Sequence, residues 1–320
     1  MQLRNASPSD LPAIVELLKT SLGESLIPKS IPLWRWKHEE GPFGQSPVIL
    51  AEHQGKIVGV RAFMPWKWQG RQKNFASLRA VDTAVHPDYQ GQGIFKKLSL
   101  SLVQKCTEEG YDFIFNSPNK QSLPGYLKMG WEIHGRLPLQ IALVRLPIRS
   151  GKPNTEPQAL PECPENLLTQ VARFKNPMAS PLHTVLSPEY LRWRYKNNPL
   201  YHYGFLTDEE TYLCVFRIKS HSRFDELRIC DLYLLGGSDS YAKGHLQEQL
   251  AAQCRIHHPA LLSGSGIAIP QLESFGLTRF LRVNRGPLVT MRNLNCKTEE
   301  WKTLMHKQGL AFSIGDLELF

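Results

Sequence analysis

The sequence predicts an α/β (α+β) fold in two similar domains, and three observations support this. The apolar run from Ala80 to Val85 precedes two glycines and an amphipathic segment, which is the pattern of a strand, a turn and a helix. Residues 147–164 contain five prolines, so this stretch fits neither a helix nor an inner strand and separates the two halves. The second half then repeats weakly the order of patterns in the first. A length of 320 residues is enough for two such domains.

The turn after this strand has the properties of an anion-binding site. Pro87 and Asp88 end the predicted strand, because proline lacks a ladder donor and aspartate favours turns. Gly91 and Gly93 then leave the backbone uncovered at the start of the helix. Unpaired N–H groups and the positive end of the helix dipole meet there and attract a phosphate. The apolar face of this helix consists of Ile94, Leu98, Leu102 and Cys106.

Three kinds of phosphate-binding loop compete for this stretch. The dinucleotide fingerprint requires a third glycine at the position of Lys96. The Walker A loop requires Gly-Lys-Ser/Thr, and none follows. A coenzyme A pyrophosphate loop of the form Gln/Arg-Gly-x-Gly fits Gln90 to Gly93. An ordinary strand–turn–helix without a ligand is the remaining alternative.

Two stretches resemble the motifs of one family. The string Val85-x-Pro87-x-x-Gln90-Gly91-x-Gly93-Ile94-x-x-x-Leu98 resembles motif A of the GNAT acetyltransferase superfamily. The stretch from Asn119 to Trp131 resembles motif B, in which an Asn is followed seven residues later by a Tyr, here Tyr126. Pro124-Gly125 departs from the helix formers that are usual there. The resemblance implies a mixed, mostly antiparallel central sheet flanked by helices in each domain.

The resemblance also implies an acetyl-CoA donor and assigns residues to it. The backbone of the strand ending at Val85 is expected to contact pantetheine and the thioester, and the loop from Gln90 is expected to hold the pyrophosphate. Tyr126 is the expected acid, because in the family this hydroxyl often hydrogen-bonds the leaving sulfur. A packed ring with a hydrated hydroxyl is the alternative. The expected donor-binding residues are Thr83, Ala84, Val85, Gln90, Gly91, Gln92, Gly93, Ile94, Asn119 and Tyr126.

The group that removes a proton from the acceptor amine has several candidates. Some family members place a Glu where this chain has Arg79, so that solution is absent. Asp82, in the same strand, is the predicted catalytic carboxylate, and His86 is an alternative. The chain end is a third source, because residues 315–320 carry two acidic side chains and the terminal carboxylate. The alternation of apolar and polar residues after Gly309 predicts a packed strand there.

The domain boundaries follow from the proline-rich stretch and from the internal repeat. The stretch from Leu191 to Lys196 resembles Leu33 to Lys37 in its Trp-Arg-aromatic-Lys core. The strand pattern from Leu227 to Asp231 matches that from Leu78 to Asp82. The predicted division is residues 1–148 for a GNAT domain, 149–164 for a linker and 165–320 for a degenerate GNAT-like domain.

The second domain has lost the residues of the donor site. Asp239-Ser240-Tyr241 replaces Gly91-Gln92-Gly93, and those side chains would crowd a pyrophosphate. Leu272 stands in the place of Tyr126. The second domain is therefore expected to complete the acceptor pocket or the sheet, or to serve as a scaffold alone.

Composition limits the classes of function. Lys and Arg exceed Asp and Glu by 9, which favours capture of the anionic CoA. The basic residues are scattered, so nucleic acid is not the expected partner. No apolar run reaches 18 residues and no signal segment opens the chain, so a cytoplasmic protein without membrane spans is expected. The six cysteines and eleven histidines lack metal-ligand spacing, so no metal is expected, and the cysteines in apolar stretches are predicted to be core thiols.

These observations predict an acetyl-CoA-dependent N-acetyltransferase. It would transfer the acyl group directly to a primary amine of a small molecule or amino sugar. A non-catalytic acyl-CoA-binding module is one alternative. A peptidoglycan-type aminoacyl transferase with twin GNAT-like domains is another, although such enzymes do not use the CoA loop. The oligomeric state stays open, with a homodimer among the alternatives.

Overall fold

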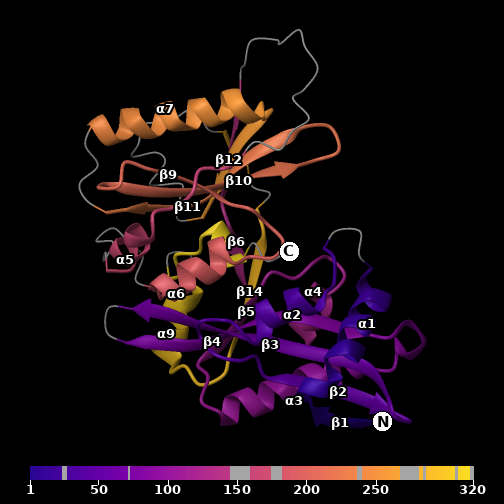
Figure 1. Ribbon diagram of the computed structural model, residues 1–320. Helices are drawn as coiled ribbons and strands as arrows, with labels where there is room; N and C mark the ends of the chain where they lie inside the picture. The colour runs from indigo at the N-terminus through magenta and orange to yellow at the C-terminus, as the bar shows by residue number, and fades with distance from the viewer. Residues whose placement is uncertain are drawn as a thin grey trace.

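The computed structural model describes residues 1–23, 27–70, 73–144, 159–173, 182–235, 240–266, 281–283, 286–306 and 309–317. Figure 1 shows two sheets lying one above the other, with helix α3 on the outer side of one and helix α7 on the outer side of the other. Mixed sheets flanked by helices are the architecture that the sequence predicted, and the fold class is confirmed.

The first sheet contains eight of the described strands, in the order β1-β2-β3-β4-β5-β14-β6, with β8 paired to β3. Neighbouring strands are antiparallel except for β4 and β5, which are parallel. Its strands are β1 (Gln2–Asn5), β2 (Val48–His53), β3 (Lys56–Gly70), β4 (Asn74–Val85), β5 (Phe113–Asn116), β6 (Glu132–Arg136), β8 (Leu182–Thr184) and β14 (Leu288–Asn293).

Four helices cover the two faces of this sheet. Helices α1 (Leu11–Leu22) and α2 (Ile31–His38) share a buried cluster with Val60 and Ala62 of β3. Helices α3 (Ile94–Glu108) and α4 (Leu123–Lys128) share another with Phe63. Side chains alternate along a strand, so these pairs of helices lie on opposite faces. The α1/α2 face and the α3/α4 face are named accordingly below.

The second sheet has the strand order β13-β7-β12-β11-β10-β9. Along the chain, β9, β10, β11, helix α7 and β12 follow the same order as β2, β3, β4, α3 and β5, including one parallel pair, β11 with β12. Its elements are β7 (Leu139–Leu143), β9 (Gly204–Thr207), β10 (Tyr212–Ser220), β11 (Asp225–Leu234), α7 (Ser240–His257), β12 (Leu261–Ser265) and β13 (Leu281–Val283).

The two halves exchange strands. β7 leaves the first half to pair with β12, and β14 comes from the second half to lie between β5 and β6. The division at residues 148 and 165 stays a prediction, and the sheets cross it. Of the proposed linker, residues 149–164, the part from 149 to 158 lies outside the described residues. The remaining helical segments are η1 (Pro8–Asp10), η2 (Pro87–Tyr89), α5 (Glu165–Arg173), α6 (Pro188–Leu191), η3 (Arg192–Lys196), α9 (Thr298–Met305) and α10 (Ile314–Leu317).

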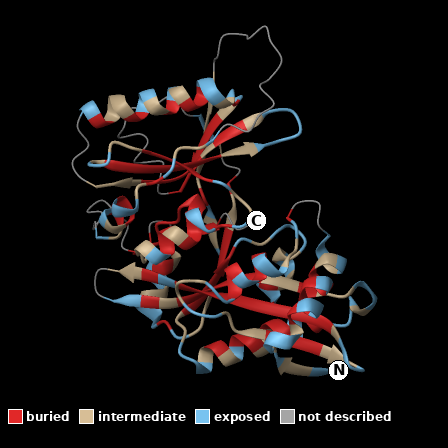
Figure 2. Ribbon diagram, in the orientation of Figure 1, coloured by how far each residue is buried: buried red, intermediate tan, exposed pale blue. Residues whose placement is uncertain are grey.

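One hydrophobic core joins the two halves. Buried strands and helices meet at the junction between the sheets (Figure 2), and this cluster takes side chains from both halves. At its centre, the indole Nε1 of Trp36 donates to the carbonyl of Trp193 at 2.9 Å, and that of Trp193 donates to the carbonyl of Trp36 at 2.7 Å. The rings stack with centroids 4.7 Å apart. Such reciprocal bonds are typical of a two-fold arrangement of related segments.

These bonds correct the register of the repeat. The sequence aligned Trp34 with Trp193, whereas the structure pairs Trp36 with Trp193. In this register Ser30 matches Ser187, and both serine side chains accept a backbone N–H three residues later, at 3.2 and 3.1 Å respectively. The repeated motif is therefore a serine-capped helical turn followed by Arg-Trp. The aromatic residues alone did not align the two copies in this register.

The tail is buried, but it is not the predicted strand. Leu310 and Ser313 make isolated bridges with Leu182 and Gly266, and the chain then turns into helix α10. Ser313 N–H donates to the carboxylate of Asp316 at 2.7 Å, which closes this turn. The apolar and polar residues after Gly309 do alternate, but this segment packs its side chains into the junction between the sheets without forming a strand ladder. Residues 318–320 lie outside the described residues.

Candidate functional site

The first feature of the site is a separation of two parallel strands. β4 pairs with β5 from Ser77 to Arg79 only. Further along, Thr83 to Val85 pair with β3 on one side, and within the described residues no strand pairs with the other edge. This edge therefore presents backbone N–H and C=O groups to a ligand that can lie beside them.

The second feature is the loop that follows β4. Gly91 and Gly93 have φ angles of 76° and 74°, and a Cβ placed on either would have nothing within 4 Å. Both are exposed, and Gly93 caps helix α3. The first N–H groups of the helix thus open onto free space beside the edge of β4, as an anion site requires. Gln90 Nε2 donates to the carbonyl of Val85 at 3.2 Å and ties the loop to the strand.

The third feature is Tyr126 of helix α4, which closes the α3/α4 face. Its ring is buried and packs edge-on against Phe95 and Trp131, at centroid distances of 5.6 and 5.1 Å. No group in the described part of the chain hydrogen-bonds its hydroxyl. The hydroxyl is therefore free to serve a bound substrate.

The departures from motif B are accommodated by local geometry. Pro124 lies in the first turn of α4, where a proline costs no hydrogen bond. A Cβ on Gly125 would lie 3.0 Å from the ring of Phe95, so this glycine allows α4 to approach α3. Asn119 is exposed, and its Oδ1 accepts the N–H of Ser122 at 2.8 Å. Asn119 therefore positions the turn before α4, and its predicted contact with the donor stays a prediction.

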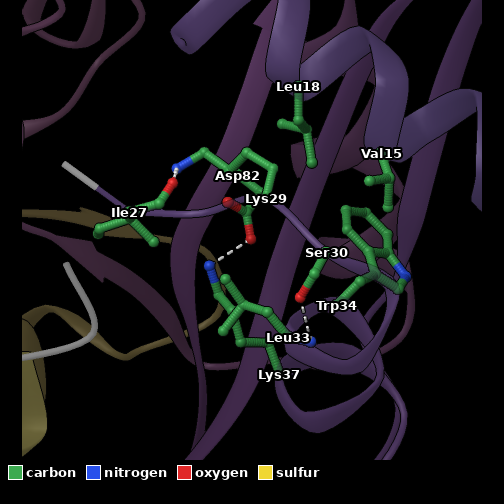
Figure 3. A pocket seen from close by; sticks show the side chains of 9 residues that line it. All are labelled: Val15, Leu18, Ile27, Lys29, Ser30, Leu33, Trp34, Lys37 and Asp82. Carbon is green, nitrogen blue, oxygen red and sulfur yellow. Dashed lines mark hydrogen bonds and ion pairs between the residues drawn. The ribbon is translucent and has the colours of Figure 1, made fainter. Parts of the chain in front are cut away.

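Asp82 lies on the α1/α2 face, opposite Tyr126. It is the extra residue where the register of β3 and β4 shifts, since Thr83 faces Arg61 and Val81 faces Ala62. Figure 3 shows its carboxylate directed at Lys37, whose Nζ lies 2.5 Å from Asp82 Oδ2.

The ammonium group of Lys37 and the imidazole of His38 hold Asp82 ionised. His38 Nε2 is 2.8 Å from the same oxygen, and His38 Nδ1 is 2.9 Å from Ser46 Oγ. Burial alone would raise the pKa of Asp82, but Lys37 and His38 outweigh it and hold that pKa well below its usual range. Burial lowers the pKa of Lys37 and of His38. Asp82 is thus suited to attract a cation and poorly suited to take up a proton. The sequence missed Lys37 and His38, because only the fold brings α2 against β4.

A small pocket lies beside Asp82. Its free volume of 10 Å³ is close to the room needed by one water. It opens between α1, α2 and β4, its lining mixes polar and apolar side chains, and it marks the approach to the carboxylate of Asp82 from the α1/α2 face. The lining residues are Val15, Leu18, Ile27, Lys29, Ser30, Leu33, Trp34, Lys37 and Asp82.

The other candidates for the base lie elsewhere. The imidazole of His86 is about one-third exposed and 3.7 Å from Asp88. Arg79, at the last paired position of β4 and β5, donates to the carbonyls of Asp316 and Leu317 at 2.7 and 2.6 Å. The residue that replaces the family's Glu therefore anchors the tail at the point where the strands separate.

The six cysteines are all buried, and none of them forms a disulfide. Burial agrees with the prediction of core thiols for Cys106, Cys214, Cys230 and Cys254. Among the described residues, no three His, Cys, Asp or Glu side chains gather closely enough to hold a metal. None of the described helices is both long and apolar enough to cross a membrane.

The fold and these features define an acyltransferase domain of the GNAT class. Residues 2–134 match the family model described as an acetyltransferase (GNAT) domain, and this part of the chain is a GNAT domain as motifs A and B predicted. The L-amino acid N-acyltransferase MnaT of Escherichia coli (strain K12) is 26% identical over 98 residues, covering 29% of this chain and 54% of the relative. The chain thus spans about half the length of this curated relative.

Solved structures resemble the fold over most of this chain. A GCN5-related N-acetyltransferase from Anabaena variabilis ATCC 29413 has a TM-score of 0.64 at 16% identity, over 92% of this chain and 73% of its own. A probable N-acyltransferase from Enterococcus faecalis V583 has a TM-score of 0.66 at 9% identity, over 92% and 72%. Eis1 from Mycobacterium abscessus has a TM-score of 0.59 at 12% identity, over 95% and 75%. At these identities the likeness concerns the fold.

Proposed function

We propose that the protein is an acyl-CoA-dependent N-acyltransferase that transfers the acyl group of its donor, with acetyl-CoA as the simplest case, to a primary amine of a small molecule. One observation carries this proposal: the free edge of β4, from Thr83 to Val85, runs directly into an open helix start at Gly91 to Gly93. The loop suits the pyrophosphate of CoA, and the strand edge suits the amide groups of pantetheine.

The chemistry follows from the groups around this strand edge and helix start. The acceptor's ammonium group first loses one proton to water, because only the neutral amine can attack the thioester carbonyl. The C–N bond then forms, the oxyanion collapses as the C–S bond breaks, the sulfur receives a proton, and the nitrogen releases its second proton to water. Backbone N–H groups along Thr83 to Val85 are the proposed donors to the oxyanion, and the Tyr126 hydroxyl is the proposed donor to the departing sulfur. Ile94 is buried, so it anchors the helix start while the loop before it stays open.

The acceptor is proposed to enter from the α1/α2 face. Asp82 would attract its ammonium group, since this carboxylate stays ionised beside Lys37 and His38. The name of the curated relative, an L-amino acid N-acyltransferase, supports including α-amino acids with amino sugars among the acceptors to be tested.

Calorimetry with CoA, acetyl-CoA and longer acyl-CoAs tests donor binding, and release of free thiol with a panel of amines tests transfer. We expect micromolar binding of acetyl-CoA and thiol release that depends on the amine. Binding without thiol release for any amine would indicate a non-catalytic acyl-CoA-binding module. Absence of CoA binding would refute the proposal and favour the alternative of an aminoacyl transferase.

A further inference from the structure

A buried arginine on the α3/α4 face lacks the partners that its charge requires. Arg61 of β3 is 0% exposed, and its Nη1 donates to the carbonyl of Val81 at 3.3 Å. Its Nε and Nη2 have no hydrogen-bond partner, and no carboxylate in the described part of the chain forms an ion pair with it. Leaving charged N–H groups buried and unpaired is costly, so a missing partner is implied.

Aromatic rings surround the guanidinium and offset only part of this cost. Its Cζ lies 4.8 Å from the ring centroid of Phe63, 5.3 Å from that of Tyr126 and 5.9 Å from that of Phe95. Cation–π contacts are weaker than a hydrogen-bonded ion pair in a dry interior. Arg194, which is also fully buried, has hydrogen-bond partners within the protein. It donates to the carbonyl of Gly315 at 2.7 Å and to the hydroxyl of Tyr203 at 3.2 Å.

The two free nitrogens form one edge of the guanidinium. The N–H bonds of Nε and Nη2 point the same way, and together they match the two oxygens of a carboxylate. Nη1 already holds Val81 and fixes the plane of the group. A carboxylate placed on this edge would satisfy both free nitrogens and neutralise the buried charge at once.

The position of this edge identifies the ligand that would carry the carboxylate. Val81 lies on β4 beyond its last pair with β5, and Phe95 and Tyr126 belong to helices α3 and α4. At about 3.3 Å per residue, Val81 lies roughly 13 Å before Val85 along β4, on the side away from the glycine loop. A donor whose pyrophosphate lies at Gly91 to Gly93 would therefore bring its acyl end, and not its phosphates, to Arg61.

We propose that Arg61 is a carboxylate-binding residue of this site, and that it selects CoA thioesters of dicarboxylic acids, such as succinyl-CoA, as donors. The inference rests on the proposed function, because it places the donor in the same cleft. The rings of Phe95 and Tyr126 lie close to the guanidinium, which is fully buried, so side chains around it must shift when the acyl group enters. The carboxylate of an amino-acid acceptor has the same chemistry, and the experiment separates the two sources.

The test compares Arg61→Met and Arg61→Lys with the wild type. Calorimetry should show succinyl-CoA binding at least 10-fold tighter than acetyl-CoA in the wild type. Arg61→Met should remove this preference and leave acetyl-CoA affinity unchanged, while Arg61→Lys should keep part of it because the charge remains without the fork. The melting temperature of Arg61→Met should stay equal or rise, since an unpaired buried charge is removed. The control Arg194→Met should lower it, because satisfied hydrogen bonds are lost.

The outcomes are separable. Arg61→Met can leave the donor preference unchanged and still raise the KM for an L-amino acid 10-fold, without raising it for the decarboxylated amine. That result would overturn donor selection and show that the carboxylate site serves the acceptor. The proposal is overturned if Arg61→Met keeps the wild-type donor preference and the wild-type KM for both acceptors. It is also overturned if Arg61→Met lowers the melting temperature as far as Arg194→Met does and changes no binding. If the wild type binds acetyl-CoA but shows no dependence on Arg61, only this inference fails. If it binds no CoA, the proposed function fails and this inference falls with it.

Discussion

The substitution Gly93→Glu places a carboxylate where the pyrophosphate is expected. Gly93 has a φ of 74°, and a Cβ there meets nothing within 4 Å, so the side chain fits without a clash in the free protein. A residue other than glycine in this left-handed region costs about 1–2 kcal/mol. Folding should therefore survive, and any large effect on CoA must come from the ligand.

The electrostatic effect can be sized from distance. Two unit charges 4 Å apart repel by about 1 kcal/mol in water and by about 4 kcal/mol at the effective dielectric near a protein surface. A pyrophosphate presents two charges, so the loss of affinity should reach at least about 2 kcal/mol, or roughly 30-fold in Kd. Gly93→Gln adds nearly the same bulk and strain without the charge, so the ratio of Kd between the Glu and Gln variants isolates repulsion. This ratio should shrink at 1 M salt.

Gly110 provides a matched control for strain. It lies just beyond the other end of helix α3, has a φ of 83°, and likewise has nothing within 4 Å of a Cβ. Gly110→Glu should lower the melting temperature about as much as Gly93→Glu and leave the Kd for acetyl-CoA unchanged. Calorimetry and thermal unfolding measure both quantities. An acetyl-CoA Kd for Gly93→Glu within threefold of the wild type, or an equal loss in Gly110→Glu, would refute the assigned pyrophosphate site.

Three further predictions concern single residues. Tyr126→Phe should lower kcat by about 10-fold to 1000-fold with little change in acetyl-CoA affinity, because the hydroxyl acts as charge develops on sulfur; Tyr111→Phe is the control, and an unchanged kcat would make Tyr126 a packing residue. Asp82→Asn should destabilise the fold by about 3 kcal/mol, because it leaves the buried Lys37 without its anion, and it should raise the KM for the acceptor. Denaturant unfolding and steady-state kinetics measure these two effects, and a stability equal to that of the wild type would contradict the ion pair. Burial and the nearby Asp316 raise the pKa of Asp231 to about 7, so the folded chain keeps a proton that the unfolded chain releases near pH 4. The free energy of unfolding should therefore fall by at most about 4 kcal/mol as pH rises from 4 to 7. Unfolding measured across this range should depend less on pH in Asp231→Asn.

Local patterns predicted the parts of the fold that depend on local physics. The strand–turn–helix around Gly91 to Gly93 appears as expected, because proline, glycine and a 3.6-residue apolar repeat act within a few residues. The hairpin of β2 and β3 and its counterpart of β9 and β10 likewise depend on local physics, since a short polar turn joins the two strands of each. The donor loop could therefore be identified before the fold was known.

Contacts between distant residues were not predicted. Trp36 and Trp193 are 157 positions apart, and their shared bonds set a register that residue type alone misaligned. The insertion of β14 between β5 and β6 also depends on non-local pairing. The pairing of Asp82 with Lys37 and the free edge of Arg61 arise where side chains from separate elements meet. An arginine in an apolar strand gives no sequence signal that distinguishes a satisfied group from an unsatisfied one.

A crystal structure of the protein with bound CoA tests the central claim most directly. The pyrophosphate should lie on the N–H groups of Gly91 to Gly93, the pantetheine along Thr83 to Val85, and the sulfur within hydrogen-bond distance of the Tyr126 hydroxyl. CoA density at any other place, or an empty cleft at millimolar CoA, would contradict it.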